Sequence, residues 1–184
     1  MPWNNGPVIV YHGCDDTSAK NLSQGSVDLA HCKTFTDFGK GFYTTTNLRQ
    51  AKNWANARCR MAAAKMRKAG QSSRPIMASV VEFTIDRTAL SSLASLCFVW
   101  ENSYPSDYWD LVSWCRNPPQ RWHHGNNYYD VVYGPVSLWP QTLVIKDCDQ
   151  ISFHTYSAVN LLNASARRVS NQVQGNDPTF PLFP

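Results

Sequence analysis

The strongest periodic pattern in this 184-residue chain lies between Asn47 and Gly70. Small or apolar side chains recur there at three- and four-residue spacing, which predicts a long helix with one buried stripe. The stripe consists of Leu48, Ala51, Ala55, Cys59, Ala62 and Met66. Asn47 is a suitable N-cap with Gln50 three residues later, as in a capping box, and Gly70 is a natural stop.

Shorter segments before and after this helix alternate in polarity or are β-branched, as strands are. The predicted strands are residues 7–11, 41–45, 76–85, 129–133 (ended by Gly134-Pro135), 142–145 and 150–154. Shorter helices are predicted at residues 17–22, 106–115 and 157–162, residues 90–98 fit either a helix or a strand, and residues 31–40 and 117–127 are predicted loops. Because strands and helices mix without a regular βαβ rhythm, the pattern favours an α+β fold over a doubly wound sheet.

Composition is typical of a globular protein with one domain. Hydrophobic residues make up 43% of the chain and charged residues 16%, a balance that excludes an intrinsically disordered chain. We expect the domain to cover residues 1–163, and residues 164–184, polar and then Pro-rich, to form a tail. No apolar run approaches the roughly 20 residues that span a bilayer, and residues 1–30 lack the basic start and apolar core of a secretory leader. These features predict a cytoplasmic protein that does not enter the membrane.

Basic residues gather between Arg49 and Arg74, in a chain whose formal net charge is +4. They fall mostly off the apolar stripe, as on the solvated face of a helix. The alternative is a surface that attracts phosphate groups, either of a dinucleotide or of a nucleic acid.

The cysteines and histidines do not form a metal-binding pattern. Six cysteines are scattered without C-x-x-C spacing, so we expect reduced thiols that pack as small hydrophobic side chains, and no zinc site. His123-His124 has no third ligand at metal spacing. We therefore predict no metal.

Three segments that are far apart in the sequence carry the residues best suited to a binding site. They are Tyr11-His12-Gly13 at the end of a strand, residues 37–47 with Ala51 and Trp54 behind them, and residues 150–155. Each has an ordinary structural alternative: a turn histidine, a Phe-Tyr pair in the core, and a glutamine at a strand edge.

Together these segments resemble the nicotinamide pocket of the ADP-ribosyltransferase superfamily, in its diphtheria-toxin and poly(ADP-ribose) polymerase-like branch. The segment Phe38-Gly-Lys-Gly-Phe-Tyr43 resembles the central motif, and Trp54 stands eleven positions after Tyr43, where the family has a second aromatic residue. His12-Gly13 resembles the first motif, and Gln150 falls where the catalytic glutamate usually stands. The pieces DFGKGFYTT, YDVVYGP and QISFHT are similar to those of an uncharacterised microbial family within this superfamily.

The resemblance implies a single α+β domain with a split, mostly antiparallel β-sheet, flanking helices and NAD in the cleft. It implies mono-ADP-ribosyl transfer from NAD to a protein or nucleic-acid acceptor, with release of nicotinamide. Tyr43 and Trp54 would stack on the nicotinamide ring, a flat cation that aromatic faces attract. His12 would bind the adenosine ribose and Gly13 the carboxamide. The remaining NAD-binding positions would be Lys40, Gly41, Phe42 and Thr44.

Gln150 limits the chemistry that the resemblance implies. Its amide can bind the 2′-hydroxyl of the nicotinamide ribose, but it is neutral and cannot act as a base. Growth of poly(ADP-ribose) chains is therefore not expected. Asp130 is the first candidate for a catalytic carboxylate and Asp37 the second, and the alternative is that both cap turns.

Two other functions remain open. One is an NAD glycohydrolase, in which water takes the place of the acceptor. The other is a catalytically inactive module that binds NAD or ADP-ribose, for which the neutral Gln150 is the argument.

Overall fold

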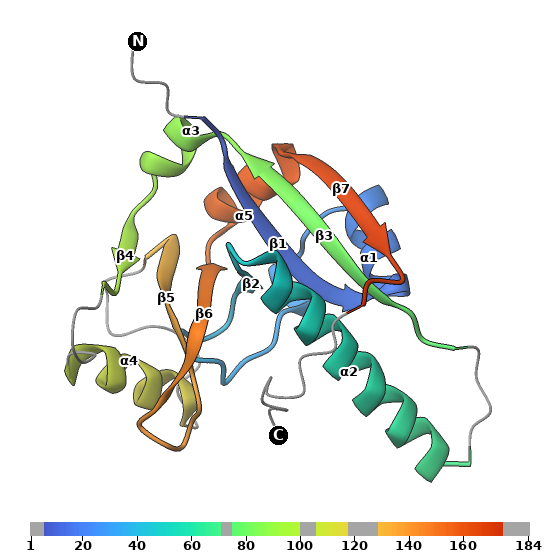
Figure 1. Ribbon diagram of the computed structural model, residues 1–184. Coiled ribbons are helices and arrows are strands. Elements are labelled where there is room, and N and C mark those ends of the chain that lie inside the picture. Colours follow the sequence, from blue (N-terminus) through green and yellow to red (C-terminus); the bar gives the residue numbers. More distant parts are fainter. Residues whose placement is uncertain (1–5, 71–74, 100–105, 118–128, 175–184) are drawn as a thin grey trace.

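The protein, seen here as a computed structural model, is described for residues 6–70, 75–99, 106–117 and 129–174. Within these ranges the chain forms five α-helices and two β-sheets (Figure 1). The elements are β1 (Val8–Asp15), α1 (Asp16–Gln24), the 3₁₀ turn η1 (Leu29–His31), β2 (Phe42–Thr44), α2 (Leu48–Lys68), β3 (Ala78–Ile85), α3 (Arg87–Ser91), β4 (Ser95–Cys97), α4 (Ser106–Arg116), β5 (Val131–Ser137), β6 (Val144–Phe153), α5 (Tyr156–Ala164) and β7 (Ala166–Asn171).

The strands form one sheet in the order β1-β3-β7 and a second in the order β2-β6-β5-β4. Among the described strands, β4 and β5 are parallel and every other pair is antiparallel. One isolated bridge, between Tyr11 of β1 and Thr45 just after β2, joins the two sheets. The predicted α+β class with a mostly antiparallel arrangement is therefore confirmed.

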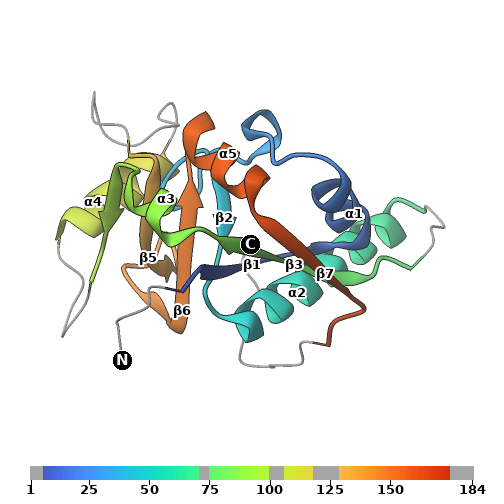
Figure 2. The same ribbon diagram turned by 90° about the horizontal axis from the view of Figure 1, so that it is seen from above.

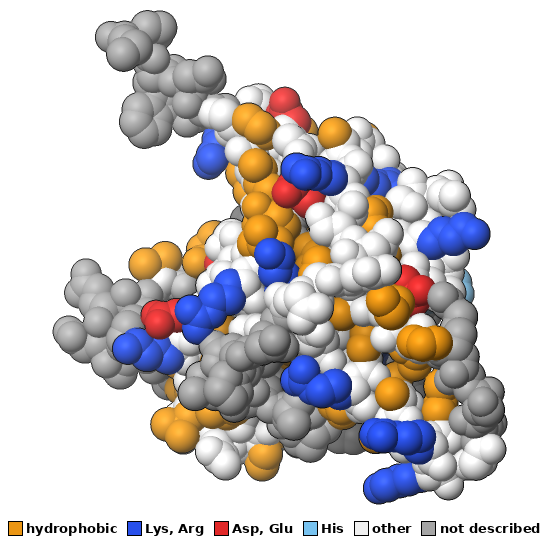
Figure 3. All heavy atoms as spheres, turned by 45° about the vertical axis from the view of Figure 1, so that its right-hand side comes forward, with side chains coloured by type: hydrophobic (Ala, Val, Ile, Leu, Met, Phe, Trp, Pro, Cys, Tyr) orange, Lys and Arg blue, Asp and Glu red, His pale blue; other side chains and the backbone are white. Residues whose placement is uncertain are grey.

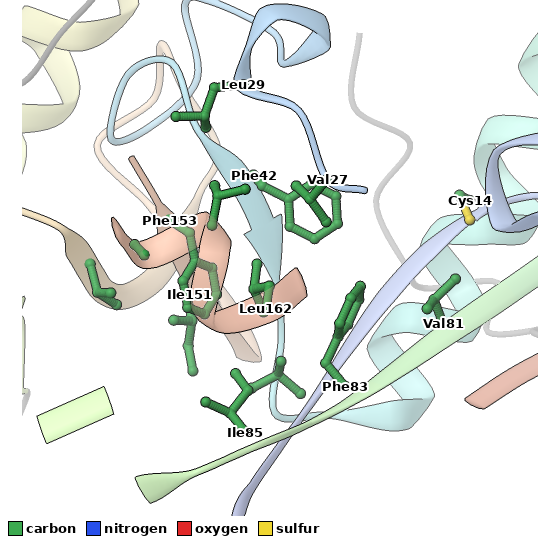
Figure 4. Close-up of a cluster of buried hydrophobic side chains, with 14 of the residues drawn as sticks. Cys14, Val27, Leu29, Phe42, Val81, Phe83, Ile85, Ile151, Phe153 and Leu162 are labelled. Atoms are coloured by element: carbon green, nitrogen blue, oxygen red, sulfur yellow. The ribbon is translucent and has the colours of Figure 1, made fainter. Parts of the chain in front are cut away.

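Helices cover both faces of the β1-β3-β7 sheet. α2 packs along β1 and β3 on one side, and α1 and α5 lie on the other (Figures 1 and 2). The main core fills the space between this sheet, α5 and strands β2 and β6, as Figure 4 shows. Phe42 and Phe83 meet edge to face at its centre, with ring centroids 5.8 Å apart. A second core, beneath α4, contains Phe38, Phe98 and Tyr108.

The long helix predicted from periodicity is α2, and it starts where the sequence places its cap. The Asn47 side chain accepts hydrogen bonds from the backbone N–H groups of Arg49 and Gln50 at 3.0 and 3.2 Å. Gln50 does not complete a capping box, because its amide binds the backbone of Asp149 on β6. The start of α2 is thereby fastened to the second sheet.

Three predicted strand ends are wrong. β1 continues through His12-Gly13 to Asp15, β5 continues through Gly134-Pro135, and the two strands predicted at residues 142–145 and 150–154 are one strand, β6. A Cβ atom at Gly134 would lie 2.9 Å from the Phe38 ring. Glycine is therefore needed here because the Phe38 ring packs against the backbone, and the chain does not turn at this residue. The ambiguous segment 90–98 contains the end of α3 and all of β4.

The segment predicted as the start of a tail belongs to a sheet. Ala166–Asn171 form β7, which pairs antiparallel with β3 from Thr84 to Ser79. The sheet therefore extends beyond residue 163. Its residues alternate between exposed and half-buried, as in an edge strand with one covered face. Residues 175–184 of the predicted tail lie outside the described part of the chain.

None of the helices in the described ranges combines the length and the apolar character needed to cross a membrane.

Candidate functional site

The three segments singled out in the sequence meet where the two sheets are joined. Tyr11 and Thr45 exchange backbone hydrogen bonds of 2.8 and 2.9 Å across the bridge between β1 and β2. β2 in turn pairs with β6, where Thr44 lies opposite Ile151, the residue after Gln150. The fold thus brings Tyr11-His12-Gly13, Phe42–Thr44 and Gln150–Phe153 onto three neighbouring strands.

Pairing between β1 and β2 stops next to this bridge. Continued pairing would place Gly13 opposite Tyr43, but the His12 ring takes up the Tyr43 carbonyl instead, with Nδ1 2.7 Å from that oxygen. The ring also stacks on Phe42, with centroids 4.5 Å apart. His12 is therefore held in one orientation between the two strands.

The hydrogen bond of His12 fixes its tautomer. A carbonyl only accepts, so Nδ1 carries the proton and donates it to Tyr43. Burial lowers the pKa of the His12 ring to about 4, although the bond to Tyr43 acts in the opposite direction. The ring is therefore neutral at pH 7, with a lone pair on Nε2. No described residue binds that nitrogen, which leaves it as an acceptor for a ligand hydroxyl.

Gly13 offers a backbone donor and acceptor at the same place. In an antiparallel strand the N–H and C=O of a residue point to one edge, and those of its neighbours point to the other edge. Those of Tyr11 point away from β3 to Thr45, so those of Gly13 also point away from β3. Within the described ranges they have no partner. A side chain here would lie 2.1 Å from the Ala51 carbonyl oxygen, so only glycine fits between β1 and α2.

Tyr43 is anchored through its hydroxyl group by the turn at residues 36–39. The hydroxyl oxygen accepts a hydrogen bond from Phe38 N–H at 3.0 Å and lies 2.9 Å from Thr36 Oγ1, and the O–H group donates to the Gly39 carbonyl at 2.8 Å. Burial raises the pKa of the phenol far above its ordinary value, so it stays protonated. Its half-buried ring meets His154 edge to face, with centroids 6.1 Å apart.

Phe42 and Tyr43 are consecutive in β2 and point to opposite faces of the strand. Since His12 stacks on Phe42, His12 and Tyr43 flank β2 and do not face each other. A ligand that contacts both must pass the edge of β2, which requires an elongated molecule.

The other predicted NAD-binding residues have mixed surroundings. Phe42 is buried in the main core, and the hydroxyl of the buried Thr44 donates to the Ile151 carbonyl at 3.1 Å, so both serve the fold. A side chain at Gly41 would lie 2.7 Å from the His154 ring. The Lys40 carbonyl is 2.9 Å from His154 Nδ1, while its side chain is half-buried. Trp54 is half-buried on α2, three residues after Ala51, which touches Gly13.

Gln150 is buried, and its amide nitrogen is fully used. Nε2 donates to Asp37 Oδ2 and to the Pro135 carbonyl, each at 2.7 Å. Because both partners only accept, these contacts settle which end of the amide is nitrogen. Oε1 has no donor among the described residues. Gln150 can therefore offer one acceptor to a ligand, but no proton.

Neither candidate carboxylate is free to act as a base. Asp130 accepts from the backbone N–H of Ala94 at 3.0 Å and from the Thr155 hydroxyl, which favours the turn-capping alternative. It lies opposite His154, at the end of the β5–β6 pair away from Gln150. Asp37 is 2% exposed and accepts five hydrogen bonds, from Arg116, Ser137 and Gln150.

The sequence gives no sign of the two residues that hold Asp37. Arg116 ends α4, and its Nε and Nη2 lie 2.9 and 2.6 Å from Asp37 Oδ1. Ser137 ends β5 and donates through its backbone N–H and its hydroxyl. Both stand in segments of ordinary composition, and only the folded chain brings them to the site.

The described residues include no group of three or more His, Cys, Asp or Glu side chains placed to hold a metal ion. His123-His124 lies outside the described ranges. None of the six cysteines, all of which lie in the described ranges, forms a disulfide. Burial raises the pKa of Cys14, next to Gly13, to about 12, so it remains a thiol and not a thiolate nucleophile.

Comparison with known proteins identifies a family but no activity. Residues 8–164 match the model of the family described as "Protein of unknown function (DUF3990)". No curated protein and no solved structure matches the chain.

Proposed function

The chain belongs to this family of unknown function, and from the geometry of its site we propose that it binds NAD and transfers a single ADP-ribose unit to a macromolecular acceptor. The observation that carries the proposal is the interruption of pairing beside the Tyr11–Thr45 bridge. There the N–H and C=O of Gly13, which have no partner among the described residues, lie beside the half-buried, neutral His12 and opposite Tyr43 in the register of the two strands.

These groups complement NAD. The carboxamide of nicotinamide has an acceptor oxygen and a donor NH2 group, which match the N–H and C=O of Gly13. The free Nε2 of His12 accepts a hydrogen bond from a ribose hydroxyl. His12 and Tyr43 lie on opposite sides of β2, and an elongated dinucleotide can reach both. Tyr43 and Trp54 are the aromatic residues proposed to hold the cationic ring.

The proposed reaction breaks the bond between C1′ of the ribose and the nicotinamide nitrogen. Nicotinamide leaves with the bonding electrons, so its positive charge is lost and no general acid is needed. The ribose passes through an oxocarbenium-like state, which a nucleophilic acceptor captures while it loses a proton to solvent. Gln150 Oε1 can accept a hydrogen bond from the 2′-hydroxyl and keep the ribose in place.

One observation favours a second function, a module that binds NAD without turnover. The residue at position 150 is glutamine, whose side chain is a neutral amide. The carboxylate beside it, Asp37, is buried and accepts five hydrogen bonds. Neither can take the proton of an acceptor. An NAD glycohydrolase would need the same proton to be removed from water.

The deciding experiment measures nicotinamide release from NAD, with cell extract as acceptor, for the native chain and for Tyr43→Ala and Gln150→Ala. We expect each substitution to lower release at least about tenfold, since each removes a contact to the nicotinamide half. Tyr43→Phe separates stacking from the anchoring hydroxyl and should retain NAD binding. Tyr156→Ala is the matched control, because this tyrosine is 72% exposed on α5.

Release without a labelled macromolecule would identify the glycohydrolase. NAD binding without release would identify the binding module. Equal release by native protein and both alanine variants would contradict the proposed site.

A further inference from the structure

We propose that Asp37 is a positioning residue for the candidate site, which orients Gln150 so that only its amide oxygen faces a ligand. The effect on NAD rests on the proposed function, whereas the orientation of Gln150 is a property of the chain itself.

The Asp37 carboxylate acts purely as an acceptor. Oδ1 receives Arg116 Nε, Arg116 Nη2 and the Ser137 hydroxyl at 2.9, 2.6 and 2.6 Å. Oδ2 receives the Ser137 N–H and Gln150 Nε2 at 2.8 and 2.7 Å. Arg116 also binds the Phe35 carbonyl at 3.2 Å, which holds the guanidinium in place. Both partners are charged in the Arg116–Asp37 pair, and the carboxylate is charged in the bonds from Ser137 and Gln150, so all of these hydrogen bonds are stronger than neutral ones.

This arrangement explains why an amide stands at position 150. Nε2 lies between two acceptors, Asp37 Oδ2 and the Pro135 carbonyl, and it satisfies each with one proton. A carboxylate there would face both acceptors without a donor and would meet the charge of Asp37. Gln150→Glu is therefore expected to destabilise the chain and not to create a more active transferase.

Asp37 also connects Gln150 to Tyr43. It belongs to the turn at residues 36–39, whose Phe38 N–H and Gly39 carbonyl bind the Tyr43 hydroxyl. One short turn thus fixes the stacking ring through its backbone and the ribose-binding amide through a side chain. Gly39, with φ at 81°, has the left-handed conformation that this turn requires.

The test is a double-mutant cycle with an independent readout of orientation. NAD affinity is measured by calorimetry for the native chain, Asp37→Asn, Gln150→Ala and the double variant. We expect Asp37→Asn to weaken binding about tenfold in the native background and to have no further effect in the Gln150→Ala background. An equal loss in both backgrounds would overturn the proposal.

The independent readout is hydrogen exchange of the side-chain amides by NMR. The Nε2 protons of Gln150 should exchange slowly in the native chain and at least about tenfold faster in Asp37→Asn. The exposed Gln24 and Gln141 give the unprotected rate in the same spectrum. Unchanged protection in the variant would overturn the proposal. If the chain does not bind NAD, the proposed function fails, and the exchange rates alone decide the role of Asp37.

Two further variants keep the test valid. Ser137→Ala removes one donor to Asp37 and leaves Gln150 unchanged. If Asp37→Asn does not fold, Ser137→Ala takes its place, and we expect a smaller effect in the same direction. Asp86→Asn makes the same charge change at the N-cap of α3, away from this cluster, and should alter neither measurement.

Discussion

At the scale of single residues, His12 should determine how stability depends on pH in mild acid. Its folded-state pKa of about 4 lies below the ordinary 6.5 because burial disfavours the charged ring. Between these values the unfolded chain binds a proton that the folded chain does not, so stability falls as pH falls from 6.5 toward 4. The full effect is about 3 kcal/mol. Urea unfolding at several pH values measures it.

The control for this prediction is His12→Gln, whose side chain does not titrate. The difference in free energy of unfolding between native and variant should change across this interval and stay constant above pH 7.5. A constant difference at every pH would show that the His12 ring is not held neutral. NAD affinity, in contrast, should not change between pH 8 and 5.5 on account of His12, because Nε2 remains an acceptor throughout.

At the scale of elements, local patterns predict what local interactions determine. α2 and β3 follow from helical and alternating periodicity. The sequence predicts two strands in place of β6 because Lys146–Asp149 is mostly polar. In the structure Asp147 has a positive φ of 58°, and the register with β5 shifts across this segment, but β5 pairs with β6 on both sides of it, at Val144 and at Asp149. β7 is polar because it is an edge strand, and only its partner β3 makes it a strand. Pairing partners cannot be inferred from such short polar segments.

The contact between β1 and α2 depends on Gly13. A methyl group there would lie 2.1 Å from the Ala51 carbonyl oxygen and 3.1 Å from the Ala55 nitrogen, both backbone atoms that cannot rotate away. Gly13→Ala should therefore displace α2 and lower the free energy of unfolding by about 3 kcal/mol, at the upper end for overpacking. Gly6→Ala is the matched control, since nothing lies within 4 Å of its added methyl group. Equal urea midpoints for the two variants would contradict this packing.

At the scale of the whole molecule, the sequence predicts which segments of the candidate site lie together better than it predicts the residues that hold them in place. His12, Tyr43 and Gln150 were predicted to meet, and the strands β1, β2 and β6 that carry them are neighbours. The buried cluster around Asp37 was not predicted, because it combines a turn, the end of α4 and the end of β5. Its members are separated by 79 and 100 positions, and no periodic pattern links them.

The charge of the molecule bears on what the acceptor is. α2 carries seven basic residues and no acidic one, and its C-terminal end extends beyond the sheet (Figure 1). On the face seen in Figure 3, Lys and Arg side chains lie among apolar and uncharged ones, with few Asp or Glu beside them. Cations near a helix C-terminus also favour its dipole, so their presence alone does not establish a binding surface.

A nucleic-acid acceptor makes a prediction that a solvated helix face does not. The chain should bind a single-stranded RNA oligonucleotide at about 50 mM salt. Its affinity should fall at least about tenfold by 200 mM salt, because the release of counterions from the RNA contributes less free energy at higher salt. Replacing Lys65, Arg67 and Lys68 by glutamine should weaken this binding and reduce the slope of log affinity against log salt concentration by about 0.7 for each charge removed. NAD affinity should stay unchanged, because these residues are remote from Gly13 along α2. Fluorescence anisotropy measures both. If RNA does not bind even at 50 mM salt, these cations serve only to solvate α2 and balance its dipole, and the acceptor has to be sought among proteins.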